Sequence, residues 1–300
     1  MKRFLIALSL FLCAVPSLFA DWRLVEIDAP PNAPRTAVEV MQKIREMHAA
    51  RAQGLRPAPD VIEFDFSESS FLIPISGNTA ASGGTYFRSD VTFANLRNAR
   101  QQFGVIYLQA GQDNSSAAPK FYALDAGAIV TVFDFVGTSL QKSGIGSLVV
   151  FGSDASGSPD VNARMDGFSR IWTPQPGSSG AVSQNFDAIS NTDLIGNGVT
   201  YILGLRQNAQ FRSNFGIVNL DSSAHNFTVT SLSSGASLSI TVPAMSVVQT
   251  GIPAGSGDST SAVQLGIATD NPYFWSAYGT TNDNTTGDGW VSRAKRFQGQ

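Results

Sequence analysis

Short apolar runs separated by turn-forming residues dominate the chain from residue 62 onward. Within one run, Leu238, Ile240 and Val242 alternate with serine and threonine, the period of two that is typical of a strand with one buried face. Turn-forming residues interrupt the runs about every ten residues without intervening helical patterns, which favours antiparallel β-sandwiches. The predicted strands lie at residues 91–93, 105–108, 129–133, 148–151, 199–203, 227–230, 238–242, 263–267 and 273–278.

A helical pattern precedes these strands. Between residues 36 and 53, Val40, Ile44 and Met47 recur at helical spacing, and Thr36 is a suitable N-cap. The sequence therefore predicts one helix over 36–53. Two uses of its apolar stripe are open: packing on the domain that follows, or binding a partner.

An internal repeat organises the predicted strands. The segment Phe87–Leu96 recurs as Phe211–Leu220, 124 residues later, with five of ten positions identical. Similar runs of strands and turns follow each copy, and each unit is near the size of an immunoglobulin-like sandwich. We therefore expect Phe87 and Phe211 to occupy equivalent core positions in two superposable domains.

These patterns predict an all-β fold: two tandem antiparallel immunoglobulin-like β-sandwiches preceded by one short α-helix. The expected divisions are a signal peptide at residues 1–20, a linker and amphipathic helix at 21–60, a first sandwich at 61–185 and a second at 186–297.

The repeated motif also carries a resemblance. Phe-Arg-Ser-Asp/Asn, then alternating apolar residues and Asn-Leu, resembles a group of poorly characterised secreted bacterial proteins with tandem immunoglobulin-like β-sandwich modules. A closing motif of that group, Asp-Asn-Thr-Thr-Gly-Asp-Gly after an aromatic strand, lies at residues 283–289. The resemblance covers about residues 70–292 and leaves out the helix. It implies the sandwich fold and an extracellular setting, and it does not imply an enzyme.

The amino terminus has the pattern of a secretory signal. Lys2 and Arg3 precede an apolar run over residues 4–15, and Ala20 closes the segment before a polar residue. We expect cleavage after Ala20 and a secreted or periplasmic product, with an uncleaved membrane anchor as the alternative. The only cysteine, Cys13, leaves with the signal, so the mature chain would have no disulfides or thiolate chemistry.

Composition narrows the range of partners. Only 14% of the residues are charged, against about 25% in an average soluble domain, so uncharged polar residues must cover the surface. The formal charge is −3, and it becomes −5 when two basic residues leave with the signal (−3 − 2 = −5). Nucleic acid is not an expected partner, because phosphate binding needs a concentrated basic face. No later segment has the length of a membrane span.

The inventory of reactive residues argues against an enzyme. His48 and His225 are the two histidines, and neither has a second histidine or cysteine nearby that would suggest zinc. No Gly-x-Ser-x-Gly motif marks a nucleophile, and the glycine-rich stretches lack the features of a phosphate loop. We therefore expect no catalytic centre and no cofactor. Any ligand site should lie on loops or in a groove between the sandwiches.

The repeated motif supplies the first candidate binding residues. Arg88 and Asp90 lie two residues apart, so on a strand they share a face and can form an ion pair. Arg212 and Asn214 hold the matching positions in the second copy. Two interpretations are open: a structural brace repeated with the module, or a polar ligand site.

A second candidate is the loop around Asp283 and Asp288, which is rich in oxygen ligands. It misses the spacing of a helix–loop–helix calcium site and its terminal glutamate, so a solvated turn is favoured over a metal site.

Two function classes follow from these observations. The first is an exported non-catalytic module for binding, adhesion or scaffolding, whose partner is an unknown protein or glycan. The second is a carbohydrate-binding or carbohydrate-active protein that stacks sugars on exposed aromatic rings. Its platform would consist of Trp172, Tyr273, Trp275 and Trp290, although aromatic residues on sandwich strands usually belong to the core. Their exposure decides between the two classes.

Overall fold

The computed structural model describes residues 23–52, 69–80, 84–175, 177, 179–195, 198–257, 262–270 and 274–296. The predicted signal peptide and Tyr273 lie outside the described residues. Every strand pair in the described ranges is antiparallel, and one helix of 16 residues precedes the main sheets, so the all-β prediction with a leading helix is confirmed.

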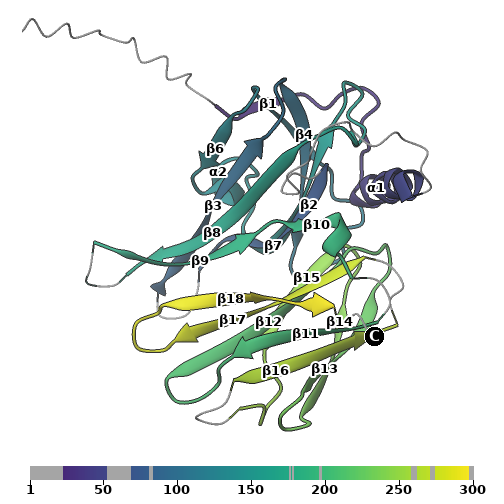
Figure 1. The fold of residues 1–300 in the computed structure, drawn as a ribbon. Helices are drawn as coiled ribbons and strands as arrows, with labels where there is room; N and C mark the ends of the chain where they lie inside the picture. Colours follow the sequence, from purple (N-terminus) through teal and green to yellow (C-terminus); the bar gives the residue numbers. More distant parts are fainter. Residues whose placement is uncertain are drawn as a thin grey trace, which may run out of the picture.

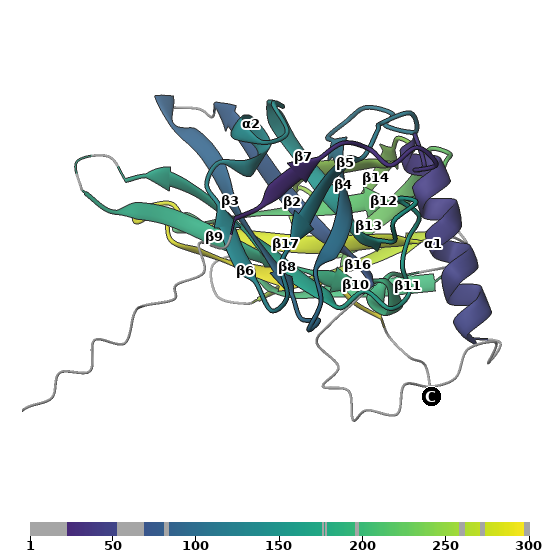
Figure 2. The same ribbon diagram turned by 90° about the horizontal axis from the view of Figure 1, so that it is seen from above.

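Helix α1 (Ala37–Ala52) forms almost where the pattern places it. The hydroxyl of Thr36 accepts a hydrogen bond from the Glu39 N–H at 3.2 Å and thereby caps the first turn. Val40 and Ile44 are fully buried against the sheets, at one side of the molecule (Figure 1, Figure 2). The apolar stripe is therefore used for packing.

The first half contains ten strands and a one-turn helix. Strand β1 lies in the segment that we expected to be a linker. That expectation is wrong for these residues, because the β1 backbone pairs with β5 and extends the sheet. The elements are β1 (Val25–Ile27), β2 (Ser70–Ala80), β3 (Tyr86–Asn95), β4 (Gln101–Gln109), β5 (Lys120–Leu124), β6 (Ile129–Val132), α2 (Phe135–Thr138), β7 (Gly144–Ser153), β8 (Met165–Pro174), β9 (Ala181–Asp187) and β10 (Ile189–Ser190).

These ten strands make one hydrogen-bonded sheet that folds over into two layers. Strand β2 pairs with β3 only between residues 78–80 and 86–88, and beyond that tip the two strands diverge. We call β6-β3-β8-β9 layer 1, and β1-β5-β4-β7-β2 with β10 layer 2. The core between them includes Phe93 and Phe103, whose rings lie 5.2 Å apart.

The second half consists of two separate sheets. We call β15-β12-β17-β18 layer 3 and β14-β13-β16-β11-β19 layer 4. They enclose their own core around Trp275 and Phe227. After a short 3-10 turn (Asn191–Asp193), the strands are β11 (Gly198–Leu205), β12 (Phe211–Asn219), β13 (His225–Ser231), β14 (Ser237–Val242), β15 (Ser246–Gly251), β16 (Val263–Thr269), β17 (Trp275–Asp283), β18 (Gly289–Arg293) and β19 (Lys295–Arg296).

The halves share one strand order. Layer 2 contains the order β5-β4-β7-β2, and layer 4 contains β14-β13-β16-β11. Each strand of layer 4 has a number nine higher than its counterpart in layer 2. Layers 1 and 3 correspond in the same way, as β6-β3-β8-β9 and β15-β12-β17-β18.

Two buried asparagines make matching hydrogen bonds in the two halves. The Asn95 amide nitrogen donates to the carbonyl oxygens of residues 99, 124 and 125, and its side-chain oxygen accepts from the N–H of residue 97. The Asn219 amide nitrogen donates to the carbonyls of residues 223, 242 and 243, and its oxygen accepts from the N–H of residue 221. Both side chains are fully buried, so each fastens a loop to the end of a neighbouring strand.

A third core joins the halves. It contains α1, side chains on the outer face of layer 2 and residues of layer 3 such as Val218, Val247 and Tyr278. Backbone hydrogen bonds add to it, because the Gly111 N–H donates to the carbonyl of Val247 at 2.9 Å. Strand β9 pairs with β8 as far as Asp187, so the first half extends slightly past the predicted boundary at residue 185.

The predicted core roles of Phe87 and Phe211 are wrong. Both phenylalanines are only half-buried, because they lie in the first two residues of β3 and β12, before the first buried position of each strand. The fully buried positions come later in each strand, at Phe93 and Phe215.

Candidate functional site

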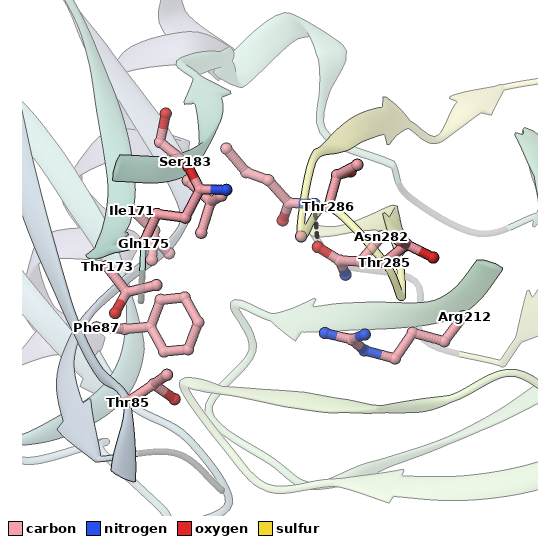
Figure 3. A pocket seen from close by; sticks show the side chains of 13 residues that line it. Thr85, Phe87, Ile171, Thr173, Gln175, Ser183, Arg212, Asn282, Thr285 and Thr286 are labelled. Carbon is pink, nitrogen blue, oxygen red and sulfur yellow. Dashed lines mark hydrogen bonds between the residues drawn. The ribbon is translucent and has the colours of Figure 1, made fainter. Parts of the chain in front are cut away.

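A groove of about 490 Å³ lies between the two halves (Figure 3). One wall comes from layer 1 and the other from layer 3 and the β17–β18 turn. Its described lining residues are Thr85, Phe87, Ile171, Thr173, Gln175, Val182, Ser183, Gln184, Arg212, Asn282, Thr285, Thr286 and Gly287. A groove between the halves is where the sequence placed any ligand site.

The layer 1 wall follows from strand alternation. Ile171, Thr173 and Gln175 are every second residue of β8 and its continuation, so they point to one side of the sheet. Phe87 of the neighbouring β3 lies beside Thr173 in Figure 3, with its ring directed across the groove. This wall combines one aromatic ring with hydroxyl and amide groups.

The opposite wall carries the cation. Arg212 extends from β12 toward the groove (Figure 3). Its Nη1 donates to Asn284 Oδ1 at 2.7 Å. The walls also touch directly, because Gln184 Nε2 donates to Asn282 Oδ1 at 3.0 Å. That bond links the two walls at the groove.

The β17–β18 turn is held rigid by Asp283. Its carboxylate oxygen Oδ1 accepts the Thr285 N–H at 2.7 Å and the Thr286 N–H at 3.0 Å, and these hydrogen bonds lower the pKa of the Asp283 carboxyl. Asp288 accepts from the N–H of Gly289 in the same turn. These bonds favour the solvated-turn interpretation, and among the described residues no cluster of three or more histidine, cysteine, aspartate or glutamate side chains could hold a metal.

The groove can form hydrogen bonds to a ligand, and none of its described lining residues is acidic. Its described lining supplies hydroxyls, carboxamides, one guanidinium and one phenyl ring, but no carboxylate, histidine or cysteine. Such a lining can bind a hydroxyl-rich or carbonyl-rich ligand, and Arg212 can pair with an anionic group. It offers no general base among those residues.

Arg88 and Asp90 form a brace away from the groove, and the expected ion pair between them is wrong. Strand pairing sets Asp90 opposite Arg170, whose Nη1 lies 3.6 Å from the Asp90 carboxylate. Arg88 Nε lies 3.9 Å from an oxygen of Asp134 instead. The Asp90–Arg170 pair follows from the strand register, because residues directly opposite each other on neighbouring strands are closer than residues two apart on one strand. Asp134, the partner of Arg88, immediately precedes α2. Asn214 is half-buried on the same face of β12 as Arg212 but does not line the groove.

Asp134 is the unusual member of this brace. It adopts the left-handed conformation (φ 49°) that favours glycine or asparagine. Burial raises the pKa of its carboxyl, and the Asp90 carboxylate adds to that rise, while the Gly137 N–H and Arg88 oppose it.

We expect Asp134→Asn to change how stability depends on pH. An acid with a raised folded-state pKa binds more protons when folded, so the free energy of unfolding falls as pH rises through the interval above the usual aspartate pKa. Asparagine keeps the backbone conformation and an acceptor oxygen but does not titrate. Denaturant unfolding at pH values below and above that interval should show the variant gaining stability relative to the unmodified chain as pH rises. A constant difference would contradict the assignment.

The tryptophans do not form a platform. Trp275 is fully buried in the core of the second half, 5.1 Å from the Phe227 ring, so its predicted binding role is wrong. Trp172 is half-buried on the outer face of layer 1 beneath two guanidinium groups, each 5.9 Å from its ring. Trp290 is 37% exposed, but its ring packs on Phe211 at 5.8 Å. The three rings lie in different environments, as alternation along separate strands requires.

His225 lies between two aspartate carboxylates. His225 Nε2 lies 2.7 Å from Asp221, and its Nδ1 lies 3.9 Å from Asp270. A Ser-His-Asp triad needs a serine at the second nitrogen, where this histidine faces another carboxylate. The Asp221 carboxylate also lies 3.9 Å from Arg45 of α1, so this cluster connects the helix to the second half.

Of the predicted site residues that the structure describes, Arg212 alone lines the groove. Sequence reasoning missed the contributions of Phe87, Thr173 and Gln184. No sequence pattern marked them as groove residues: residues 171–175 read Ile-Trp-Thr-Pro-Gln, without a polar and apolar alternation.

Comparison with protein-family models and with curated proteins finds no match to this chain. Within the described ranges, no helix has the length and apolar character needed to cross a lipid bilayer.

Proposed function

We propose that the protein is an exported, non-catalytic binding module of the cell envelope or extracellular space, and that it holds its ligand in the groove between the halves. The observation that carries this proposal is the composition of the groove. Two separate sheets converge to place Phe87, Arg212 and several hydroxyl and carboxamide groups around one space. Interfaces between domains are common positions for such sites.

We also infer that the halves are duplicated immunoglobulin-like sandwiches. The shared strand order and the matching hydrogen bonds of Asn95 and Asn219 support a duplication. The signal pattern at residues 1–20 and the resemblance to secreted bacterial modules support export. An adhesion or scaffold role is consistent with a fold whose second domain is fastened to the first by a shared core.

Carbohydrate is the second candidate class of ligand. Phe87 offers an apolar ring against which a sugar face can stack, and neighbouring side chains such as Thr173 and Gln184 can bind its hydroxyl groups. This version replaces the tryptophan platform, since Trp275 is buried. A protein segment with exposed carbonyl and carboxylate groups is the competing ligand, for which Arg212 would be the main anchor.

Arrays of glycans and of peptides, probed with the exported protein, test the proposal. We expect a reproducible ligand, and we expect Phe87→Ala to weaken it by about tenfold, or about 1.4 kcal/mol. Arg212→Gln should weaken anionic ligands more than neutral ones. Val25→Ala is the control, because that side chain is 43% exposed on β1 and lies outside the groove. Binding unaffected by both groove variants, or turnover abolished by replacing one acidic residue without unfolding, would refute the proposal.

A further inference from the structure

Exposed apolar side chains gather on two faces of the molecule. These faces are the outer side of layer 1 and the outer side of layer 4, the first and last of the four stacked layers. On or beside layer 1 they are Tyr86 (39% exposed), Leu96 (47%), Ile129 (57%), Phe133 (73%) and Phe168 (36%). On or beside layer 4 they are Val199 (45%), Leu203 (45%) and Leu232 (50%).

Three layer 1 positions have buried counterparts in layer 3. The matched asparagines align the strands, so that each counterpart has the same offset and the same strand partner. Leu96 and Leu220 directly follow the matched asparagines Asn95 and Asn219. Ile129 lies opposite Ala94, as Val247 lies opposite Val218, one residue before each asparagine. Phe168 lies opposite Thr92, as Tyr278 lies opposite Gly216, three residues before each asparagine. The layer 3 members are at most 1% exposed, because they pack in the core that joins the halves.

The same comparison applies to layers 2 and 4. Val105 lies on β4 between β5 and β7, and Val229 lies at the matching position of β13 between β14 and β16. Leu108 and Leu232 each follow their valine by three residues, so they are counterparts. Leu108 is buried in the joining core, whereas Leu232 is 50% exposed.

The layer 4 face also has an apolar centre. A Cβ added at Gly266 would meet the Leu232 side chain at 3.2 Å and the Tyr201 ring at 3.8 Å, so these two side chains flank a shallow glycine position. The counterpart of Tyr201 in layer 2 is Leu72, which is buried in the joining core. The layer 4 face therefore keeps bulky side chains at two positions that the joining core uses, Tyr201 and Leu232, while the counterparts of Ile106 and Phe121 are Thr230 and Ser239.

We propose that these two faces bind each other in successive copies of the chain, the outer face of layer 1 of one molecule against the outer face of layer 4 of the next. The contact would repeat the packing that already joins layers 2 and 3 within the molecule. It rests on the proposed duplication of the halves and does not depend on a ligand in the groove.

This contact joins two different faces, so it is heterologous and leaves one free face at each end of a dimer. Growth then continues into a chain of molecules, or into a ring if the rotation between copies closes. The burial of the apolar side chains on both faces supplies the driving force.

Two charge substitutions test the proposal. In sedimentation velocity over a concentration series, the unmodified exported protein should form species larger than a dimer. Ile129→Asp removes one face and Leu232→Asp removes the other, so each variant alone should be monomeric. An equal mixture should form dimers that grow no further, because each variant supplies the intact face that the other lacks.

Val25→Asp is the matched control, since Val25 is 43% exposed on β1 and belongs to neither face. It should leave the assembly unchanged, and circular dichroism should show that all variants are folded. Leu96→Asp provides a second variant on the layer 1 face. An unmodified protein that stays monomeric, a Leu232→Asp variant that still dimerises, or a mixture that remains monomeric would each overturn the proposal. Loss of ligand binding in the groove would leave it standing.

Discussion

Replacing Trp275 with alanine should lower the free energy of unfolding by about 3–5 kcal/mol, the usual cost of emptying a large aromatic position in a core. Trp275 is fully buried, its ring packs 5.1 Å from Phe227, and it lies among the apolar side chains between layers 3 and 4. Neighbouring strands cannot close the resulting cavity without breaking their hydrogen-bonded register. Denaturant unfolding followed by fluorescence and circular dichroism measures the loss.

Trp290→Ala is the matched control for this substitution. Its ring is 37% exposed and contacts the half-buried Phe211, so truncation should cost about 1 kcal/mol or less. Phe211→Ala should likewise fall well below the cost of a core phenylalanine. If Trp290→Ala destabilised the protein as strongly as Trp275→Ala, the assignment of these aromatic positions would be wrong.

Asn219→Ala should be destabilising by about 3 kcal/mol, because an unsatisfied buried polar group costs about 1–3 kcal/mol and this side chain binds three carbonyl oxygens. Asn95→Ala should have a similar effect in the first half, since its amide makes the matching set of bonds. Asparagine-to-aspartate changes should be worse, because a carboxylate cannot donate to carbonyls and would be a buried charge. Equilibrium unfolding of the alanine and aspartate variants at Asn95 and Asn219 tests whether the two asparagines have the same role in the two halves.

Asn226→Ala supplies the comparison for these asparagine variants. Asn226 is exposed on β13 and accepts a hydrogen bond from the Thr241 hydroxyl at 2.6 Å, so its loss should cost about 0.5 kcal/mol or less. A large effect at Asn219 with none at Asn95 would show that the two halves use the motif differently, and would weaken the proposed duplication.

Periodicity predicted the helix and nine of the strands, but it did not predict β1, β2, β9 or β18. Leu238, Ile240 and Val242 alternate as expected on β14, and Val40 and Ile44 are buried on α1. Periodicity could not show which sheet faces would meet. The outer face of layer 2 is apolar because α1 and layer 3 cover it, and a fully buried strand shows no alternation that distinguishes its two sides.

The candidate site was only partly predictable for a related reason. Arg212 could be singled out because it belongs to a repeated motif. Gln184 has no distinguishing feature in the sequence, and the hairpin of β8 and β9 brings it into contact with Asn282. The partner exchange of Arg88 and Asp90 depends on which residue of β8 faces each position of β3. Register across strands is a tertiary property, and spacing along one strand does not encode it.

The core that joins the halves has a consequence for cooperativity. Helix α1 and the facing sides of layers 2 and 3 bury their apolar groups in each other, so neither half can unfold without uncovering the other. We therefore expect the two halves to unfold together in one transition and not as two independent domains. A single cut in the chain between the halves would leave two fragments still held together by their packing, and the nicked protein would separate only on denaturation.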